Sequence, residues 1–140
     1  MSGQIRESYE ENIAKTVIVI VLILFSTGVY SQSTWKAPKS ADEIKNPLKG
    51  DAAATKKGKK LYTQLCVICH GTKGKGDGVA GVALNPKPAS FISKAFSSQT
   101  DGGLFWKISE GNAPMAAYKD LISETERWQL INYLRTLKKK

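Results

Sequence analysis

The spacing of apolar residues predicts a helix over residues 51–65 of the 140-residue chain. Apolar positions recur there every three or four residues, which places them on one face of a helix. Asp51 is a residue type that caps helix N-termini. A glycine in mid-helix costs stability, so Gly58 predicts the close approach of a second helix. The residues that share this face are Ala54, Gly58, Leu61, Tyr62 and Leu65.

Two more helices are expected later in the chain. A short one over residues 104–111 ends at a glycine, and Leu104, Phe105 and Ile108 share its apolar face. The last one, over residues 123–137, opens with a serine and a glutamate spaced as in a capping box. These elements predict an all-α fold. The apolar stripe of the last helix comprises Leu130, Ile131, Leu134 and Leu137, with Tyr133 on its border.

The N-terminal part of the chain contains an apolar run at residues 16–25. This run is short for a membrane span, which needs about 20 residues, and it suits the central region of a signal peptide cleaved after Ser31. The alternative is an uncleaved membrane anchor over residues 13–30. Either interpretation places the following domain outside the cytoplasm.

Residues 32–50 are expected to be an extended linker, because two prolines interrupt any helix and small polar residues fill the gaps. Trp35 is the exception, and it either packs back onto the domain or is exposed. The predicted organisation is therefore a signal peptide or anchor at 1–31, a linker at 32–50 and one domain at 51–140.

The candidate chemistry is concentrated in one stretch, Cys66-Val67-Ile68-Cys69-His70. Two cysteines three positions apart, followed at once by histidine, form the signature of covalent haem attachment. Each thiol can add across one haem vinyl group, and His70, the only histidine, can ligate the iron. Three alternatives use the same residues: a redox dithiol, half of a zinc site and a structural disulfide. A dithiol site is expected with a βαβ pattern and a closed zinc site needs four ligands, and the sequence offers neither.

The segment after this motif is rich in glycine and proline. Residues 71–78 have glycine at four of eight positions but lack the Gly-Lys-Ser/Thr of a phosphate-binding loop, so a tight loop against the haem edge is expected. Residues 84–91 are expected to be extended, because two prolines restrict their backbone. Leu84 and Phe91 are candidate walls of the haem pocket.

Two further predictions concern the iron ligands. A backbone carbonyl within residues 79–86 is expected to accept a hydrogen bond from the second nitrogen of His70. Met115, the only methionine beyond the initiator, lies in a loop after a proline. A core position is the alternative for this methionine, but with a haem placed and no second histidine its sulfur is the expected sixth ligand. Trp106 lies off the apolar face of its helix, and it is expected towards the haem rim.

The charge balance is basic, with 21 Lys and Arg against 12 Asp and Glu. Loss of the first 31 residues would leave 19 against 9. Such a surface attracts acidic partners through an attraction that salt weakens. No motif of interleaved basic and aromatic residues accompanies it, so nucleic acid is not an expected partner. The lysines at positions 56, 57, 59 and 60 are expected to be a solvated flank of the first helix.

Together these residues resemble a class I c-type cytochrome, of the small bacterial monohaem kind, over about residues 51–137. The resemblance rests on the order of the glycine-containing first helix, the Cys-x-x-Cys-His motif, a proline loop, a short helix, Met115 and a last helix with Trp128. It implies about four short helices around one covalently attached haem. It also implies that the first and last helices cross closely, at Gly58, Tyr62, Leu130 and Tyr133. Such members often have proline where this chain has Val79.

The resemblance implies an electron-transfer protein rather than an enzyme. Cys66 and Cys69 would form the haem c thioethers, and His70 and Met115 would be the axial ligands of the iron. The expected carrier is periplasmic and exchanges single electrons within a respiratory chain, with an oxidase, reductase or dehydrogenase whose docking surface is acidic. The alternative is a cytochrome subunit of a respiratory or dehydrogenase complex, tethered to the inner membrane through residues 13–30. A peroxidase or gas-binding haem protein would need an open sixth site.

Overall fold

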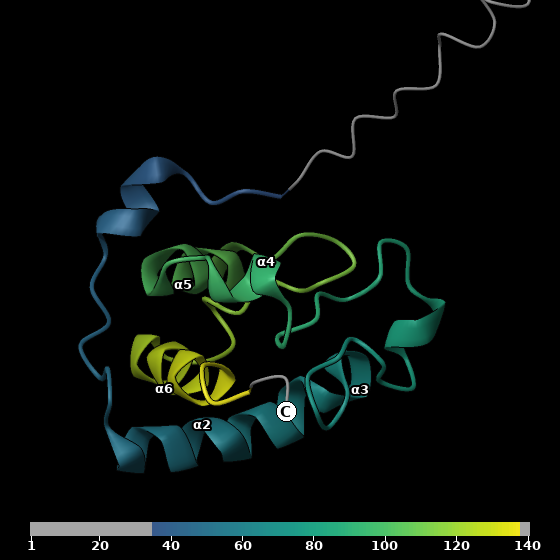
Figure 1. Cartoon of the computed structure of the whole chain (residues 1–140), viewed down its shortest axis with the longest axis horizontal. Coiled ribbons are helices and arrows are strands. Elements are labelled where there is room, and N and C mark those ends of the chain that lie inside the picture. Colours follow the sequence, from purple (N-terminus) through teal and green to yellow (C-terminus); the bar gives the residue numbers. More distant parts are fainter. Residues whose placement is uncertain (1–34, 138–140) are drawn as a thin grey trace, which may run out of the picture. The chain divides into compact units, whose positions relative to one another are not determined.

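The computed structural model describes residues 35–137, which belong to one compact unit (Figure 1). Between these limits the chain forms helices and no strand, so the predicted all-α fold is confirmed. No helix of this part is long and apolar enough to cross a membrane. The predicted signal peptide or anchor at 1–31 lies outside the described residues. The elements are η1 (Lys39–Glu43), α2 (Ala52–Leu65), α3 (Val67–His70), η2 (Gly81–Ala83), α4 (Lys94–Ser97), α5 (Asp101–Glu110) and α6 (Glu124–Leu134).

Helices α2 and α6 cross at Gly58, as the sequence predicts (Figure 1). A Cβ atom on Gly58 would lie 1.8 Å from the backbone oxygen of Gln129. Only glycine therefore lets the two backbones approach this closely. Beside the crossing, the rings of Tyr62 and Tyr133 pack with centroids 5.2 Å apart.

Helix α2 begins at the predicted cap, since the carboxylate of Asp51 accepts a hydrogen bond from the Ala54 amide at 2.9 Å. The predicted capping box of α6 is also present. The Ser123 hydroxyl accepts from the Glu126 amide at 3.3 Å, and the Glu126 carboxylate accepts from the Ser123 amide at 2.8 Å. Helix α6 ends three residues before the predicted end, because the chain tightens into a turn after Leu134.

Helix α5 begins at Asp101, three residues before the predicted start. Two glycines occupy its first turn, and glycine is a poor helix former, so the apolar pattern alone does not reach this turn. The Thr100 hydroxyl supplies the missing cap by accepting from the Gly103 amide at 2.9 Å. A Cβ atom on Gly102 would lie 2.0 Å from the Ala41 oxygen, so the first turn needs this glycine for a close backbone contact. The short helix α4 was not predicted.

The core lies between α2, α5 and α6. Its most buried side chain is Ile131, which is 0% exposed. Phe105 stacks on Trp128 with ring centroids 4.1 Å apart, which joins α5 to α6. The buried cluster comprises Tyr62, Phe96, Leu104, Ile108, Trp128, Leu130, Ile131 and Leu134.

Residues 35–50, which we call the strap, are not extended throughout. They contain the 3-10 helix η1 and pack on α5 and α6 before α2 begins (Figure 1). Ala41 is 2% exposed. The Asn46 amide donates to Asp101 at 3.0 Å and to Asn132 at 2.9 Å, and Asn132 in turn donates to the Leu48 oxygen. The boundary between linker and domain at residue 51 stays a prediction, but the strap belongs to the packed structure.

The packing of the strap brings two tryptophans, Trp35 and Trp106, into contact. Trp35 packs back onto the domain, with its ring 6.5 Å from that of Trp106 and 5.2 Å from the ammonium group of Lys107. The expectation that Trp106 points to the haem rim is replaced by this contact. The sequence could not show it, because it depends on how the strap folds.

Candidate haem-binding site

The two cysteines lie on one helical turn at the end of α2. Cys66 is the residue that follows α2, and Cys69 is part of α3. The His70 amide donates to the Cys66 oxygen at 2.8 Å, which closes the turn. Both thiols are free and partly buried, and no disulfide joins them in the structure. Burial, and secondarily the neighbouring Cys69, raises the pKa of the Cys66 thiol to about 12.

The His70 ring is held on two sides. Its Nδ1 lies 3.2 Å from the Ala89 oxygen, and its face stacks on Phe91 with centroids 4.4 Å apart and planes 20° apart. When Nδ1 carries the proton and donates to this carbonyl, Nε2 is the nitrogen that can coordinate iron. Burial lowers the pKa of His70, and the hydrogen bond to Ala89 opposes that shift.

The carbonyl that accepts from His70 belongs to Ala89, so the prediction of a carbonyl within residues 79–86 is wrong. The chain returns past the glycine-rich loop after its two prolines. The Phe91 amide donates to the Gly74 oxygen at 2.7 Å, and a Cβ atom on Gly76 would lie 2.3 Å from the Pro88 oxygen. This return brings Ala89, rather than the earlier segment, next to the imidazole.

The glycine-rich loop folds tightly on the motif, as expected. Gly71 has a φ of +77°, and its oxygen accepts a hydrogen bond from the buried Tyr62 hydroxyl at 2.5 Å. A Cβ atom on Gly78 would lie 2.5 Å from the Ile68 oxygen. The loop therefore lies against the backbone of the Cys-x-x-Cys segment itself.

Met115 lies in a closed turn after α5. The Asn112 amide donates to the Met115 oxygen at 3.0 Å, and the Met115 amide donates back at 2.9 Å. The methionine is partly buried and packs against the core. The turn is also tied to the cysteines, because the Tyr118 hydroxyl lies 3.4 Å from the oxygen of Leu65, the residue before Cys66. Burial raises the pKa of Tyr118, and the two nearby cysteines add to this shift.

These donors fit a covalently attached haem. Two free thiols stand one turn apart, one imidazole nitrogen is engaged and the other can coordinate, and a thioether lies on a turn tied to the same helix end. Within residues 35–137 no group of three or more His, Cys, Asp and Glu side chains could hold a metal ion. The described residues therefore do not supply the four grouped ligands that a closed zinc site needs.

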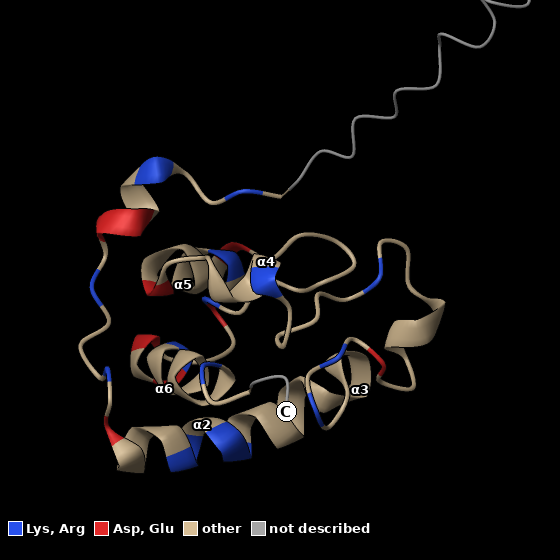
Figure 2. Cartoon of the chain, in the orientation of Figure 1, with Lys and Arg blue, Asp and Glu red and all other residues tan. Residues whose placement is uncertain are grey.

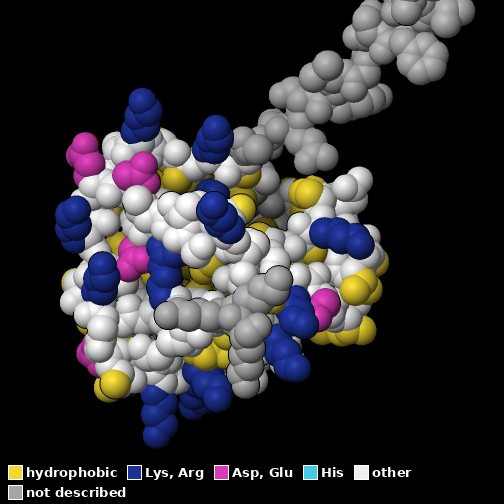
Figure 3. Space-filling model, viewed as in Figure 1, with side chains coloured by type: hydrophobic (Ala, Val, Ile, Leu, Met, Phe, Trp, Pro, Cys, Tyr) yellow, Lys and Arg dark blue, Asp and Glu magenta, His cyan; other side chains and the backbone are white. Residues whose placement is uncertain are grey.

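The segment that contains the motif is more basic than the segment that follows it. Residues 51–91 contain seven lysines and two aspartates, whereas residues 92–137 contain five basic and five acidic residues. In Figure 2 the basic positions follow α2 and the loop beside α3. The four lysines of α2 are exposed, as predicted. Figure 3 shows basic side chains dispersed over the visible face rather than gathered at one point.

The chain is similar to known c-type cytochromes. Residues 53–134 match the family model described as "Cytochrome C oxidase, cbb3-type, subunit III". The solved structure of the "KustC0563 c-type cytochrome" is 27% identical with a TM-score of 0.50, and the match covers 59% of this chain and 98% of that chain.

A chain of the "Kuenenia stuttgartiensis reducing HAO-like protein complex Kustc0457/Kustc0458" is 26% identical with a TM-score of 0.59. This match covers 69% of the present chain and 50% of the other, so the present chain spans about half of that relative. Comparison with curated proteins gave no match.

Proposed function

Because the chain belongs to the family of c-type cytochromes described as cbb3-type cytochrome c oxidase subunit III, and so binds haem c covalently, we propose that it is a periplasmic carrier of single electrons. The observation that supports this proposal is the placement of His70. It directly follows Cys69, it lies on the same turn as the two free thiols, and its Nδ1 faces the Ala89 oxygen. The family accounts for electron transfer in general. The periplasmic location and the identity of the ligands are the proposed part.

Each residue has one role in this proposal. Cys66 and Cys69 hold the haem by two thioether bonds, and His70 is oriented by Ala89 and by the stacked Phe91. The Met115 sulfur would be the second protein ligand of the iron. The haem supplies an iron that alternates between the ferrous and ferric states.

With His70 and Met115 both ligating the iron, no position would remain for oxygen or another small ligand. Thioether ligation and exclusion of water both favour the reduced state. The protein therefore passes electrons without making or breaking bonds in a substrate.

The charge distribution indicates what kind of surface a redox partner would present to this protein. The excess of lysine in residues 51–91 favours a redox partner with an acidic rim, because opposite charges accelerate encounter and the effect declines with salt. An oxidase, a reductase or a dehydrogenase can each present such a surface.

Two measurements test the carrier. The intact mass of the native protein should equal a chain beginning at Gln32 plus one haem, and the reduced absorption spectrum should not change under carbon monoxide. A carbon monoxide complex would show an open sixth position and would favour the gas-binding alternative. A mass without haem would contradict covalent attachment.

A second candidate is a fixed subunit of a membrane-bound complex. One structural relative is a chain of a multi-protein complex, which favours this candidate. The discriminating observation is whether the mature protein is recovered free in periplasmic extract or only with membranes. Retention of residues 13–30 in the mature chain would support the anchored subunit.

A further inference from the structure

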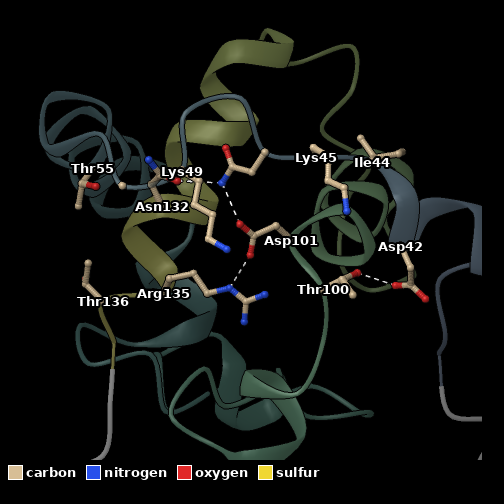
Figure 4. A pocket seen from close by; sticks show the side chains of 12 residues that line it. Asp42, Ile44, Lys45, Lys49, Thr55, Thr100, Asp101, Asn132, Arg135 and Thr136 are labelled. Atoms are coloured by element: carbon tan, nitrogen blue, oxygen red, sulfur yellow. Dashed lines mark hydrogen bonds and ion pairs between the residues drawn. The ribbon is translucent and has the colours of Figure 1, made fainter.

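A cavity of about 670 Å³ lies beneath the strap (Figure 4). None of Cys66, Cys69, His70 and Met115 lines it. Ligand pockets commonly have volumes of about 300–1,000 Å³, so its size suits a small molecule. The lining residues are Asp42, Ile44, Lys45, Asn46, Lys49, Gly50, Thr55, Thr100, Asp101, Asn132, Arg135 and Thr136.

The cavity is built by the strap and by the ends of three helices. Six of its twelve lining residues belong to the strap, at positions 42–50, and two more, Arg135 and Thr136, follow α6. These eight residues all lie outside the residues 53–134 that match the family model. The other four, Thr55, Thr100, Asp101 and Asn132, lie within it, so the cavity forms where the strap and the end of α6 meet the matched region.

A fixed polar network forms one wall. The Arg135 Nε donates to Asp101 at 2.7 Å, and the Asn46 amide donates to the other oxygen of the same carboxylate at 3.0 Å. Burial raises the pKa of Asp101, but the hydrogen bonds from Asn46 and Arg135 and the charges of Arg135 and Lys49 outweigh burial and lower it. Asp101 is therefore ionised, and both of its oxygens are engaged.

The hydrogen-bond donors of the cavity that remain without a partner favour an anionic ligand. Three cationic side chains line it, and Figure 4 shows those of Lys45, Lys49 and Arg135 directed towards the space around Asp101. Both oxygens of Asp101 are bound, and one oxygen of Asp42 accepts from the Thr100 hydroxyl. Arg135 uses its Nε for Asp101 and one Nη for the Gln99 oxygen, and its other Nη has no hydrogen-bond partner within residues 35–137. Within the described part of the chain neither lysine makes an ion pair. Spare donors thus exceed spare acceptors.

The lining is not purely polar. Ile44 is 44% exposed at the edge of the cavity, and the lysines contribute hydrocarbon stems, which pack on apolar surface while the charged ends reach a polar group. A ligand with an apolar body and one anionic group would use both parts of the cavity.

From this arrangement we propose that the cavity under the strap binds a small organic anion, with the anionic group between Lys49 and Arg135 and the apolar body against Ile44. Binding stabilises the packed strap, because the ligand contacts the strap and the helix ends together. The site is independent of the haem and of the electron-carrier proposal.

The test is a calorimetric titration of the haem-loaded protein with phenyl phosphate at low ionic strength. We expect one saturable site. Loss of one charge-assisted hydrogen bond weakens binding by about tenfold or more, so Lys49→Gln should raise the dissociation constant by about tenfold. The matched control is Lys57→Gln, which removes the same charge from an exposed position on α2 outside the cavity, and it should change the constant by less than about twofold.

The apolar part of the proposal is tested separately with inorganic phosphate, which should bind more weakly than phenyl phosphate. Thermal unfolding and the haem spectrum of each variant establish that it is folded. The proposal is overturned by the absence of a saturable site, or by equal effects of Lys49→Gln and Lys57→Gln, which would indicate general attraction to a basic protein. None of these results depends on the axial ligands, so failure here leaves the carrier proposal intact.

Discussion

At the scale of single residues, the candidate site depends on one local turn and on one backbone carbonyl that is distant in the sequence. Cys66, Cys69 and His70 follow from one local motif, and the structure puts them on one turn because the motif continues directly from α2. The partner of His70 was predicted in the wrong segment. Ala89 is nineteen residues away, and its position depends on loop packing that no local pattern encodes.

Met115 gives the most direct test of the axial assignment. Met115→Ala should abolish the spectrum of a six-coordinate low-spin haem, lower the reduction potential and allow carbon monoxide to bind, because a thioether ligand favours the reduced state and closes the sixth position. Absorption spectroscopy and potentiometry measure these changes. Leu121→Ala, at a 67% exposed position that also lies between α5 and α6, should change none of them. An unaltered spectrum in Met115→Ala would exclude this ligand.

Gly58 tests the helix crossing. Alanine favours a helix over glycine by about 1 kcal/mol, but its Cβ would lie 1.8 Å from the Gln129 oxygen, and overpacking costs about 1–3 kcal/mol or more. Gly58→Ala should therefore lower the free energy of unfolding by about 2 kcal/mol, measured by denaturant titration of the haem-loaded protein. Lys57→Ala, at the exposed neighbouring position, should leave it within about 0.5 kcal/mol. A more stable Gly58→Ala variant would contradict the close crossing.

At the scale of elements, helices with a strong apolar period and a cap were predictable, and elements fixed by distant contacts were not. Helix α2 and the start of α6 follow from their patterns and caps. The apolar pattern does not reach the first turn of α5, because its glycines are poor helix formers and allow close contact with the strap. The strap was predicted to be extended because prolines break helices, and the pattern could not reveal that Asn46 and Asn132 join it to α6.

Asn132 holds the strap to α6, since it is 7% exposed and bonds to both Asn46 and the Leu48 oxygen. Asn132→Ala should lower the free energy of unfolding by about 1–3 kcal/mol, because buried polar partners are left unpaired. It should also speed cleavage by trypsin at the strap lysines, which mass spectrometry of the fragments can follow. Asn85→Ala, at an exposed loop position, is the control. Equal protease resistance of both variants would show that the strap is held in another way.

At the scale of the whole molecule, charge is distributed unevenly between two parts of similar length. Residues 51–91 have the larger excess of lysine, seven against two aspartates, whereas residues 92–137 are balanced. The net charge and the lysines on the flank of α2 were predictable from the sequence, but the position of the glycine-rich loop beside α3 required the fold. This distribution should favour the approach of negatively charged reagents to the haem.

The reduced protein should therefore react faster with ferricyanide, an anionic oxidant, than its driving force alone predicts, and the rate should fall as salt rises. Lys73→Glu, in the loop beside α3, should slow the reaction more than Lys94→Glu, in the balanced part of the chain. Stopped-flow absorbance measures both rates. A rate that does not depend on salt, or identical rates for the two variants, would contradict the asymmetry.

The packed strap has a consequence for reach. Sixteen residues in an extended linker could span about 55 Å, and they would let a domain sweep a wide volume around any fixed point. In this protein the same residues pack on α5 and α6 from Trp35 onwards, so none of that length acts as a flexible linker. A partner bound at Trp35 would therefore contact a domain whose orientation is restricted, because no flexible linker separates the two.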